Sequence, residues 1–313
     1  MARKIALAGI GKIARDQHVP AIADSPDWEL AATVSRHGSV DGVKAFDDLA
    51  TMLEKRPDIE VVSLCMPPLP RFDHAATAIL AGRHVMLEKP PGATLAECSV
   101  LEAMARSAGV SIYATWHSRE AAQVQRAKAW LRGSRIVRVN VVWKEDVRRW
   151  HPGQTWIWQA GGLGVFDPGI NALSIVTEIL ADPVHLSAAE LFVPANCEMP
   201  IAAHLDFKHP HGAACTAEFD FRQEGEQVWT IEVGTDSGTL TLSEGGARLT
   251  IDGVEQVAAD DSGNPLIGEY PRLYAKMAAL VGAAGVDMDI SPMTLVADAF
   301  LIGRRIGVEP FVE

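Results

Sequence analysis

Residues 4–14 read Lys-Ile-Ala-Leu-Ala-Gly-Ile-Gly-Lys-Ile-Ala, and this stretch decides the fold. An apolar run typical of a strand leads into Gly-x-Gly-x-x-Ala, with Gly9, Gly11 and Ala14 at the three small positions. Gly9 permits a tight turn, Gly11 lets backbone N–H groups approach a pyrophosphate, and Ala14 lets the next helix pack closely. At the start of an alternating strand–helix chain, this pattern predicts a dinucleotide-binding turn. The expected cofactor contacts in it are Gly9, Gly11, Lys12 and Ile13.

The next strand-like run, residues 28–34, ends in Ser35-Arg36-His37 and indicates which nucleotide binds. A site for NAD usually has Asp or Glu near this strand end, where the carboxylate bonds the ribose hydroxyls. Here a hydroxyl and a cation stand instead, and a guanidinium can pair with a 2′-phosphate. The alternative is an ordinary solvated loop arginine. We expect NADP to be preferred, with NAD possible as a second cofactor.

Composition excludes several classes of partner. The chain has 313 residues and a formal net charge of −12, with no basic run, which argues against nucleic acid and anionic membrane surfaces. Its apolar stretches are shorter than the roughly 18 residues that a membrane span needs. The four cysteines are widely spaced and without a Cys-x-x-Cys pair, which is typical of reduced thiols in a cytoplasmic protein.

The hydrophobic period divides the chain into two domains. Up to about residue 133, short apolar strands alternate with helices, which predicts a doubly wound parallel sheet covered on both faces. Beyond it, five runs alternate apolar and polar residues, and Gly245-Gly246 and Asp252-Gly253 punctuate them as hairpin turns. We therefore expect a Rossmann domain over residues 1–120. Residues 121–313 should form an open, mainly antiparallel sheet for substrate binding and dimerisation, covered on one face by helices at 167–180, 271–284 and 293–306, the last two of which could pack back on the first domain.

The other face of that second sheet should leave apolar side chains and an edge uncovered. Pairing two such faces about a two-fold axis would bury them. The sequence thus predicts a homodimer, or a dimer of dimers.

Glu88-Lys89-Pro90 follows a predicted parallel strand, at the edge where open α/β sheets bind their ligands. A lysine there can polarise or deprotonate a substrate hydroxyl. The alternative is a solvated lysine before a proline turn. The expected cofactor contacts beyond the glycine turn are Ser35, Arg36, His37, Met66, Pro67, Glu88 and Lys89.

With Gly9-Ile-Gly11, His18-Val-Pro20, Glu88-Lys89-Pro90 and the change to an open sheet, the chain resembles the glucose–fructose oxidoreductase / inositol dehydrogenase / MocA family over essentially its whole length. The resemblance implies that Lys89 contacts both nicotinamide ribose and substrate. It also implies that the bond before Pro90 is often cis.

The second motif usual in that family is Asp-x-x-x-His on a helix, and here Asp167-Pro-Gly-Ile-Asn171 stands in its place. The i, i+4 spacing puts Asp167 and Asn171 on one helix face. An alternative is that Asp167 is simply an N-cap before Pro168. With asparagine for histidine, the chain resembles the aldose 1-dehydrogenases that act on L-arabinose or D-galactose. In that interpretation Asp167 or neutral Lys89 accepts the proton and Asn171 orients the oxygen.

Aromatic residues also favour a sugar. Four of the eight tryptophans lie between residues 143 and 158, and indoles offer flat faces for sugar C–H groups together with an N–H donor. The expected substrate contacts are His117, Glu145, Trp150, His151, Asp167, Asn171 and Trp229, of which Trp150 and Trp229 are chosen by resemblance. His209-Pro-His211 lacks the spacing typical of a zinc site, so no metal is expected.

The leading hypothesis is an NADP-preferring enzyme that oxidises a monosaccharide, an aldopyranose of the L-arabinose or D-galactose type, at C1 to its lactone. One alternative is an oxidoreductase that acts on another sugar carbon or on a cyclic polyol. A more distant alternative is a non-enzymatic NADPH-binding sensor, which predicts a spoiled lysine or aspartate; both Lys89 and Asp167 are present.

Overall fold

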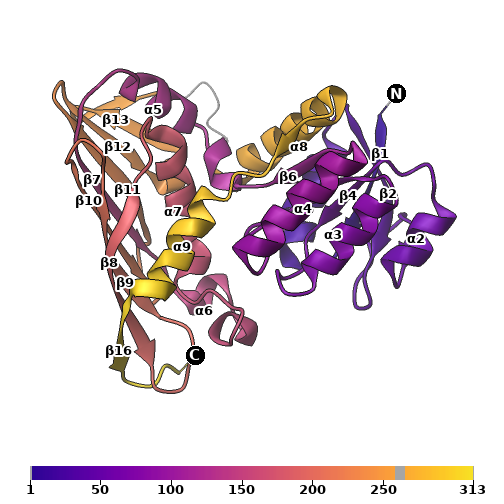
Figure 1. The fold of residues 1–313 in the computed structure, drawn as a ribbon, viewed down its shortest axis with the longest axis horizontal. Coiled ribbons are helices and arrows are strands. Elements are labelled where there is room, and N and C mark those ends of the chain that lie inside the picture. The colour runs from indigo at the N-terminus through magenta and orange to yellow at the C-terminus, as the bar shows by residue number, and fades with distance from the viewer. Residues whose placement is uncertain (1, 258–264, 313) are drawn as a thin grey trace. The chain divides into compact units, whose positions relative to one another are not determined.

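The computed structural model describes residues 2–257 and 265–312, and the chain divides into two compact units. The first contains residues 1–117 and 266–290, and the second contains residues 118–265 and 291–313. The chain therefore passes between the units more than once, because a helix late in the sequence returns to the first unit. Figure 1 shows the elements of both units.

The first unit is built on a parallel sheet with the strand order β15-β6-β5-β4-β1-β2-β3. Its strands are β1 (Arg3–Ala8), β2 (Trp28–Val34), β3 (Ala45–Phe46), β4 (Val61–Leu64), β5 (His84–Leu87), β6 (Ile112–Ala114) and β15 (Val286–Asp287). The strands β4 and β6 are buried throughout, as expected when both faces of a sheet are covered. This confirms the doubly wound Rossmann domain.

Helices cover that sheet on both faces. They are α1 (Val19–Ala23), which follows a π-helical turn over Ala14–His18, α2 (Leu49–Lys55), α3 (Arg71–Leu80), α4 (Leu95–Ala108) and α8 (Pro265–Ala283). One core cluster joins Leu7 of β1 to Ile22 of α1 and to Tyr274 and Met277 of α8. Figure 1 shows α3 and α4 side by side along the sheet.

The strand order places β1 between β2 and β4. The chain goes from β1 to β2 on one side and continues with β4 on the other, so the order reverses beside β1. Ligands of open α/β sheets bind at such a switch point, outside the carboxyl ends of the strands.

The second unit has a nine-stranded sheet among the described residues, with the order β14-β13-β12-β11-β7-β10-β9-β8-β16. The strands are β7 (Ile136–Lys144), β8 (His185–Pro194), β9 (Ala202–Lys208), β10 (Ala214–Asp220), β11 (Val228–Thr235), β12 (Thr239–Ser243), β13 (Arg248–Ile251), β14 (Val254–Gln256) and β16 (Arg304–Val308). Neighbours are antiparallel except for β10 with β7 and β16 with β8. The helices α5 (Val124–Leu131), α7 (Phe166–Ile179) and α9 (Ser291–Ile302) cover one face (Figure 1), which confirms the predicted open sheet.

Two local expectations have different outcomes. The Asp252-Gly253 hairpin is confirmed, because Asp252 and Gly253 have φ of 50° and 78° between β13 and β14. The helix expected over residues 293–306 is wrong beyond Ile302. A Cβ at Gly303 would lie 2.3 Å from the carbonyl oxygen of Ala299, and the chain then pairs in parallel with β8 as β16.

The open face of the second sheet carries polar side chains. Arg138 pairs with Glu232 at 2.6 Å, and Lys144 on the same strand pairs with Glu218 at 2.5 Å. Val142 of β7 and Phe192 of β8 lie on the same face and are partly exposed, so the face is mixed: apolar side chains are uncovered, as expected, but ion pairs stand between them. Self-association through it stays a prediction.

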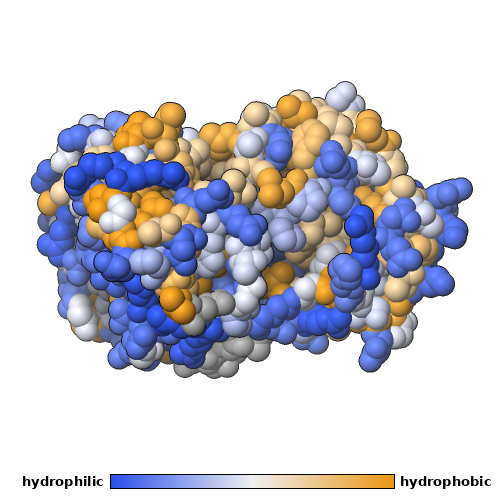
Figure 2. Space-filling model, turned by 90° about the horizontal axis from the view of Figure 1, so that it is seen from below, coloured by the Kyte–Doolittle hydropathy of each residue, from blue (hydrophilic) through white to orange (hydrophobic). Residues whose placement is uncertain are grey.

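The molecular surface in Figure 2 also carries both hydrophobic and hydrophilic residues. On the face in Figure 2, hydrophobic patches are interrupted by hydrophilic residues. Within the described part of the chain, no helix is both long enough and apolar enough to cross a membrane.

Candidate active site

The glycine turn of the first unit lies against the end of β4. Gly9 has a φ of +89°, and a Cβ there would lie only 2.6 Å from the backbone nitrogen of Met66. At Gly11 a Cβ would meet nothing within 4 Å. The turn thus leaves open space at the position where backbone N–H groups approach a pyrophosphate, so these residues fit a dinucleotide. Ile13 is half-buried against the core and Pro67 is exposed beside Met66.

The loop after β2 carries the three residues expected to select the nucleotide. Ser35 Oγ accepts a hydrogen bond from the His37 N–H at 3.3 Å. Arg36 and His37 are exposed, so the guanidinium can reach a ligand. Lys12 instead forms an ion pair with Asp16 one helical turn later.

A second cation lies near this loop that the sequence analysis did not select. A Cβ at Gly38 would lie 2.8 Å from the carbonyl oxygen of Ile10 and 3.0 Å from Nη2 of Arg15. The absence of a side chain at Gly38 therefore lets the loop contact the glycine turn and brings it close to the Arg15 guanidinium. Arg15 was missed because it follows the glycine motif in sequence and only the fold brings it to the loop.

Glu88 is 4% exposed, and both of its carboxylate oxygens have protein partners. Oε1 accepts from His18 Nε2 at 3.0 Å and from Tyr270 Oη at 2.6 Å. Oε2 accepts from the backbone N–H of Lys89 at 2.7 Å. Glu88 was expected to contact the cofactor, and the hydrogen bonds of its carboxylate join it to His18, Tyr270 and the backbone N–H of Lys89. The Lys89–Pro90 bond is cis, as the family resemblance implied.

The buried His18–Glu88 pair is ionic. Burial alone would lower the pKa of His18, but Cys65, Tyr274 and Glu88 raise it well above the ordinary value. Burial would likewise raise the pKa of Glu88, but the His18 hydrogen bond and the charges of His18 and His117 hold it below the ordinary value. A carboxylate and an imidazolium thus stabilise each other beside the Lys89 backbone. Tyr270 and Tyr274 were missed because they come from α8, far along the chain.

His117 follows β6 and is 7% exposed. Its Nδ1 lies 2.6 Å from Glu269 Oε2, and its ring stacks on Tyr270 with the centroids 5.7 Å apart. The Glu269 carboxylate fixes the orientation of the His117 ring through Nδ1. A histidine that binds a ligand through Nε2 is often oriented in this way.

In the second unit, the structure brings five of the predicted substrate contacts together. Trp229 Nε1 donates to Glu145 Oε2 at 2.9 Å, and the ring centroids of Trp150 and Trp229 are 5.5 Å apart. His151 Nε2 lies 3.7 Å from Glu145 Oε1 and 3.6 Å from Asp167 Oδ2. Two buried carboxylates, an imidazole and two indoles therefore form one cluster, with hydrogen-bonding groups and apolar faces suited to a sugar.

Asp167 lies inside the first turn of α7, and Val165 precedes the helix. The alternative that Asp167 is an N-cap is therefore wrong. Asn171 follows one turn later on the same helix face and is half-buried. Gly169 lies two residues from each of them, on the opposite side of α7, and lets that side pack tightly on the sheet, since a Cβ there would lie 2.7 Å from the Phe219 ring on β10.

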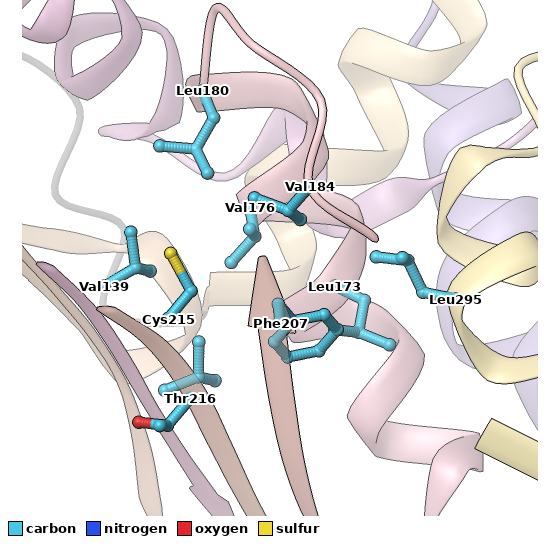
Figure 3. Close-up of a pocket in the computed structure, with 10 residues that line it drawn as sticks. Val139, Leu173, Val176, Leu180, Val184, Phe207, Cys215, Thr216 and Leu295 are labelled. Carbon is cyan, nitrogen blue, oxygen red and sulfur yellow. The ribbon is translucent and has the colours of Figure 1, made fainter. Parts of the chain in front are cut away.

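The hollows found in the second unit lie away from this cluster. The one in Figure 3, between α7 and the sheet, has a volume of about 10 Å³ and is lined by Val139, Leu173, Val176, Cys215 and other residues. A water needs roughly 10–15 Å³ and several polar partners, so this is a packing gap. A larger hollow of about 310 Å³ is lined by residues 176, 177 and 180–185 and by four residues of α9, and none of the predicted contacts lines it. Among the described residues, no group of three metal-ligating side chains could hold a metal.

Comparisons with known proteins show which family the chain belongs to. Residues 3–115 match the model of an oxidoreductase family with an NAD-binding Rossmann fold. The chain is 42% identical over 311 residues to a galactose 1-dehydrogenase of Pseudomonas fluorescens, covering 99% of both sequences. A solved D-galactose-1-dehydrogenase from Rhizobium etli is 51% identical, with a TM-score of 0.94 over 100% of this chain and 99% of that one. A 3-ketoreductase from Actinomadura kijaniata in complex with NADP shares the fold at a TM-score of 0.83 and 17% identity, covering 98% of this chain and 100% of that one.

Proposed function

We propose that this chain, which belongs to the oxidoreductase family with an NAD-binding Rossmann fold, oxidises an aldopyranose of the D-galactose type at C1 to the aldonolactone. The observation that carries the proposal is the cluster of Glu145, Trp150, His151, Asp167 and Trp229 in the second unit. Its polar groups suit sugar hydroxyls and its indole faces suit sugar C–H groups. The likeness to galactose 1-dehydrogenases covers both units.

Three side chains carry the chemistry in this proposal. A bound nicotinamide supplies the hydride acceptor. Either Asp167 or neutral Lys89 takes the proton of the anomeric hydroxyl, and Asn171 orients its oxygen. An Asn171→Ala variant should therefore lose less turnover than variants that remove either candidate base.

We propose that NADP is preferred over NAD. Arg36 is exposed in the loop after β2, and the Gly38 contact brings that loop close to the Arg15 guanidinium. Guanidinium groups bind a phosphate through charged hydrogen bonds, and a carboxylate at this place would repel it. NAD remains a possible second cofactor, since its ribose hydroxyls can still bond to Ser35.

The second candidate is oxidation at another carbon of the sugar. A D-glucoside 3-dehydrogenase of Escherichia coli is 27% identical over 197 residues, which cover 58% of this chain and 54% of that one. That likeness is lower and covers less of the chain than the likeness to galactose 1-dehydrogenase.

A substrate panel separates the candidates. D-galactose, L-arabinose and D-glucose are offered with NADP and with NAD, and the absorbance of the reduced nicotinamide is followed. Methyl D-galactoside is the matched control, because its C1 oxygen carries a methyl group and only carbons other than C1 can be oxidised. Turnover of D-galactose without turnover of the methyl galactoside supports the proposal, and comparable turnover of both contradicts it.

We also propose a reducing compartment, the cytoplasm, and a homodimer or higher homo-oligomer. No disulfide links the four cysteines, and burial raises the pKa of the Cys215 and Cys197 thiols above their ordinary values. The open face of the second sheet, where charged side chains already pair within the sheet and Val142 and Phe192 are partly exposed, would then meet its own copy.

A further inference from the structure

Arg71, the first residue of α3, is an arginine that the sequence analysis did not select, and it is only 2% exposed. Its Nη1 donates to the carbonyl oxygens of Glu88 and Pro90, and its Nη2 donates to the carbonyl oxygen of Met66. Glu88 and Pro90 are the residues on either side of Lys89. Met66 is one of the cofactor contacts expected after β4.

The guanidinium keeps its charge in this place. Burial lowers the pKa of Arg71 to about 10, while the nearby Glu88 carboxylate acts in the opposite direction. The side chain is thus protonated at neutral pH. Its Nε has no hydrogen-bond partner among the described residues, so the hydrogen bonds it makes come from the two terminal nitrogens.

The three carbonyl groups belong to two loops, one after β4 and one after β5, and Arg71 fixes the position of one loop relative to the other. Met66 follows β4, and its backbone nitrogen would lie 2.6 Å from a Cβ at Gly9 in the glycine turn. Glu88 and Pro90 belong to the loop after β5. One planar guanidinium therefore connects the loop against the glycine turn with the loop that carries Lys89.

The Lys89 loop is also held by other contacts. The Lys89 N–H donates to the carboxylate of Glu88, which is itself fixed by His18 and Tyr270. Further along, a Cβ at Gly92 would lie 2.9 Å from Cys98 Sγ on α4. The contacts of Glu88 and Gly92 act on the loop after β5, whereas the hydrogen bonds of Arg71 connect that loop with the loop after β4.

We propose that Arg71 is a positioning residue, which sets the loops after β4 and β5 so that the nucleotide site and Lys89 have their working geometry. This inference rests on the proposed role of Lys89. A guanidinium fixes the relative positions of several acceptors because its five donors lie in one rigid plane. A lysine ammonium, on a flexible stem, does not impose such geometry.

The test compares Arg71→Met and Arg71→Lys with the wild-type enzyme. NADPH affinity is measured by nucleotide fluorescence without sugar, kcat and KM by turnover, and folding by thermal unfolding. A misplacement of about 1 Å can cost about 100-fold in rate. We expect folded Arg71→Met to bind NADPH about 10-fold more weakly and to lose about 10- to 100-fold in kcat, with Arg71→Lys between it and wild type. A third variant, Arg71→Ala, leaves space for a free guanidinium ion. Millimolar guanidinium chloride should restore part of the kcat of this variant, whereas an equal concentration of sodium chloride should not.

Arg56→Met is the matched control. Arg56 belongs to the same unit and also donates to a backbone carbonyl, that of Ala31 at 2.6 Å, but Ala31 lies within β2. Its replacement should lower the unfolding temperature and leave NADPH affinity unchanged. Wild-type NADPH affinity and kcat in a folded Arg71→Met variant overturn the proposal, and where that variant does not fold, the same result in Arg71→Lys overturns it. The fluorescence measurement needs no sugar, so a failure of the proposed substrate is seen separately, in the wild-type panel.

Discussion

Replacing Gly9 and Gly11 in turn by alanine should separate folding from cofactor binding in the glycine turn. At Gly9 the backbone has a φ of +89° and the new Cβ would lie 2.6 Å from the Met66 nitrogen. The left-handed conformation costs an alanine about 1–2 kcal/mol, and overpacking costs about 1–3 kcal/mol more. The sum is about 2–5 kcal/mol, which at about 2–4 °C per kcal/mol lowers the unfolding temperature of Gly9→Ala by roughly 4–20 °C.

Gly11→Ala is the matched partner, because its Cβ would meet nothing within 4 Å in the protein. Its unfolding temperature should stay within about 1 °C of wild type, since no contact is made or lost. The same methyl group occupies the space into which a pyrophosphate would come, so NADPH affinity should fall at least about 10-fold. Differential scanning fluorimetry and NADPH fluorescence give the two readouts. An unfolding temperature of Gly9→Ala equal to wild type, or an unchanged NADPH affinity of Gly11→Ala, would refute the reasoning.

Three further outcomes are expected. Ser35→Asp with Arg36→Leu should cut kcat/KM for NADP at least about 10-fold and improve NAD, because a charged hydrogen bond contributes about 1.5–3 kcal/mol; an unchanged ratio of the two cofactors in steady-state kinetics contradicts the assignment. Lys89→Ala and Asp167→Ala should each lower kcat by about 10²–10⁴ while NADPH affinity is largely kept, and near-normal turnover in either folded variant would remove that residue from the chemistry. Because the folded-state pKa of His18 lies above its ordinary value, its charge stabilises the fold below about pH 6.5, and this stabilisation is lost as pH rises through the folded value; unfolding in urea at several pH values should show a decline toward alkaline pH that His18→Gln lacks.

Much of the fold could be predicted from local pattern. The Gly9–Ala14 turn and the change of period near residue 133 identify the two kinds of sheet, and Asp252-Gly253 identifies a hairpin through its backbone preference. The strand β16 could not be found in this way. Its sequence, Arg-Arg-Ile-Gly-Val, is short and follows the apolar helix α9 directly after Gly303, and only the partner strand β8, far away in sequence, makes the extended form favourable.

The site divides in the same manner. Glu145, His151 and Asp167 were selected one by one, and their meeting in one cluster depends on the packing of β7, α6 (Val147–Trp150) and α7. Arg71 gave no sequence signal, because its partners are backbone carbonyl groups. Tyr270 gave none, because its partner is the carboxylate of Glu88, more than 180 residues earlier in the chain. Such partners follow from tertiary structure, and a motif search does not register them.

The most direct test of C1 oxidation follows the hydrogen itself. The enzyme is given D-galactose labelled with deuterium at C1, together with NADP, and both products are analysed by mass spectrometry. The deuterium should move to the nicotinamide, and the sugar product should be the unlabelled lactone, because the hydride leaves from C1. Turnover in which the deuterium stays on the sugar would contradict the account, and so would the absence of turnover with either cofactor.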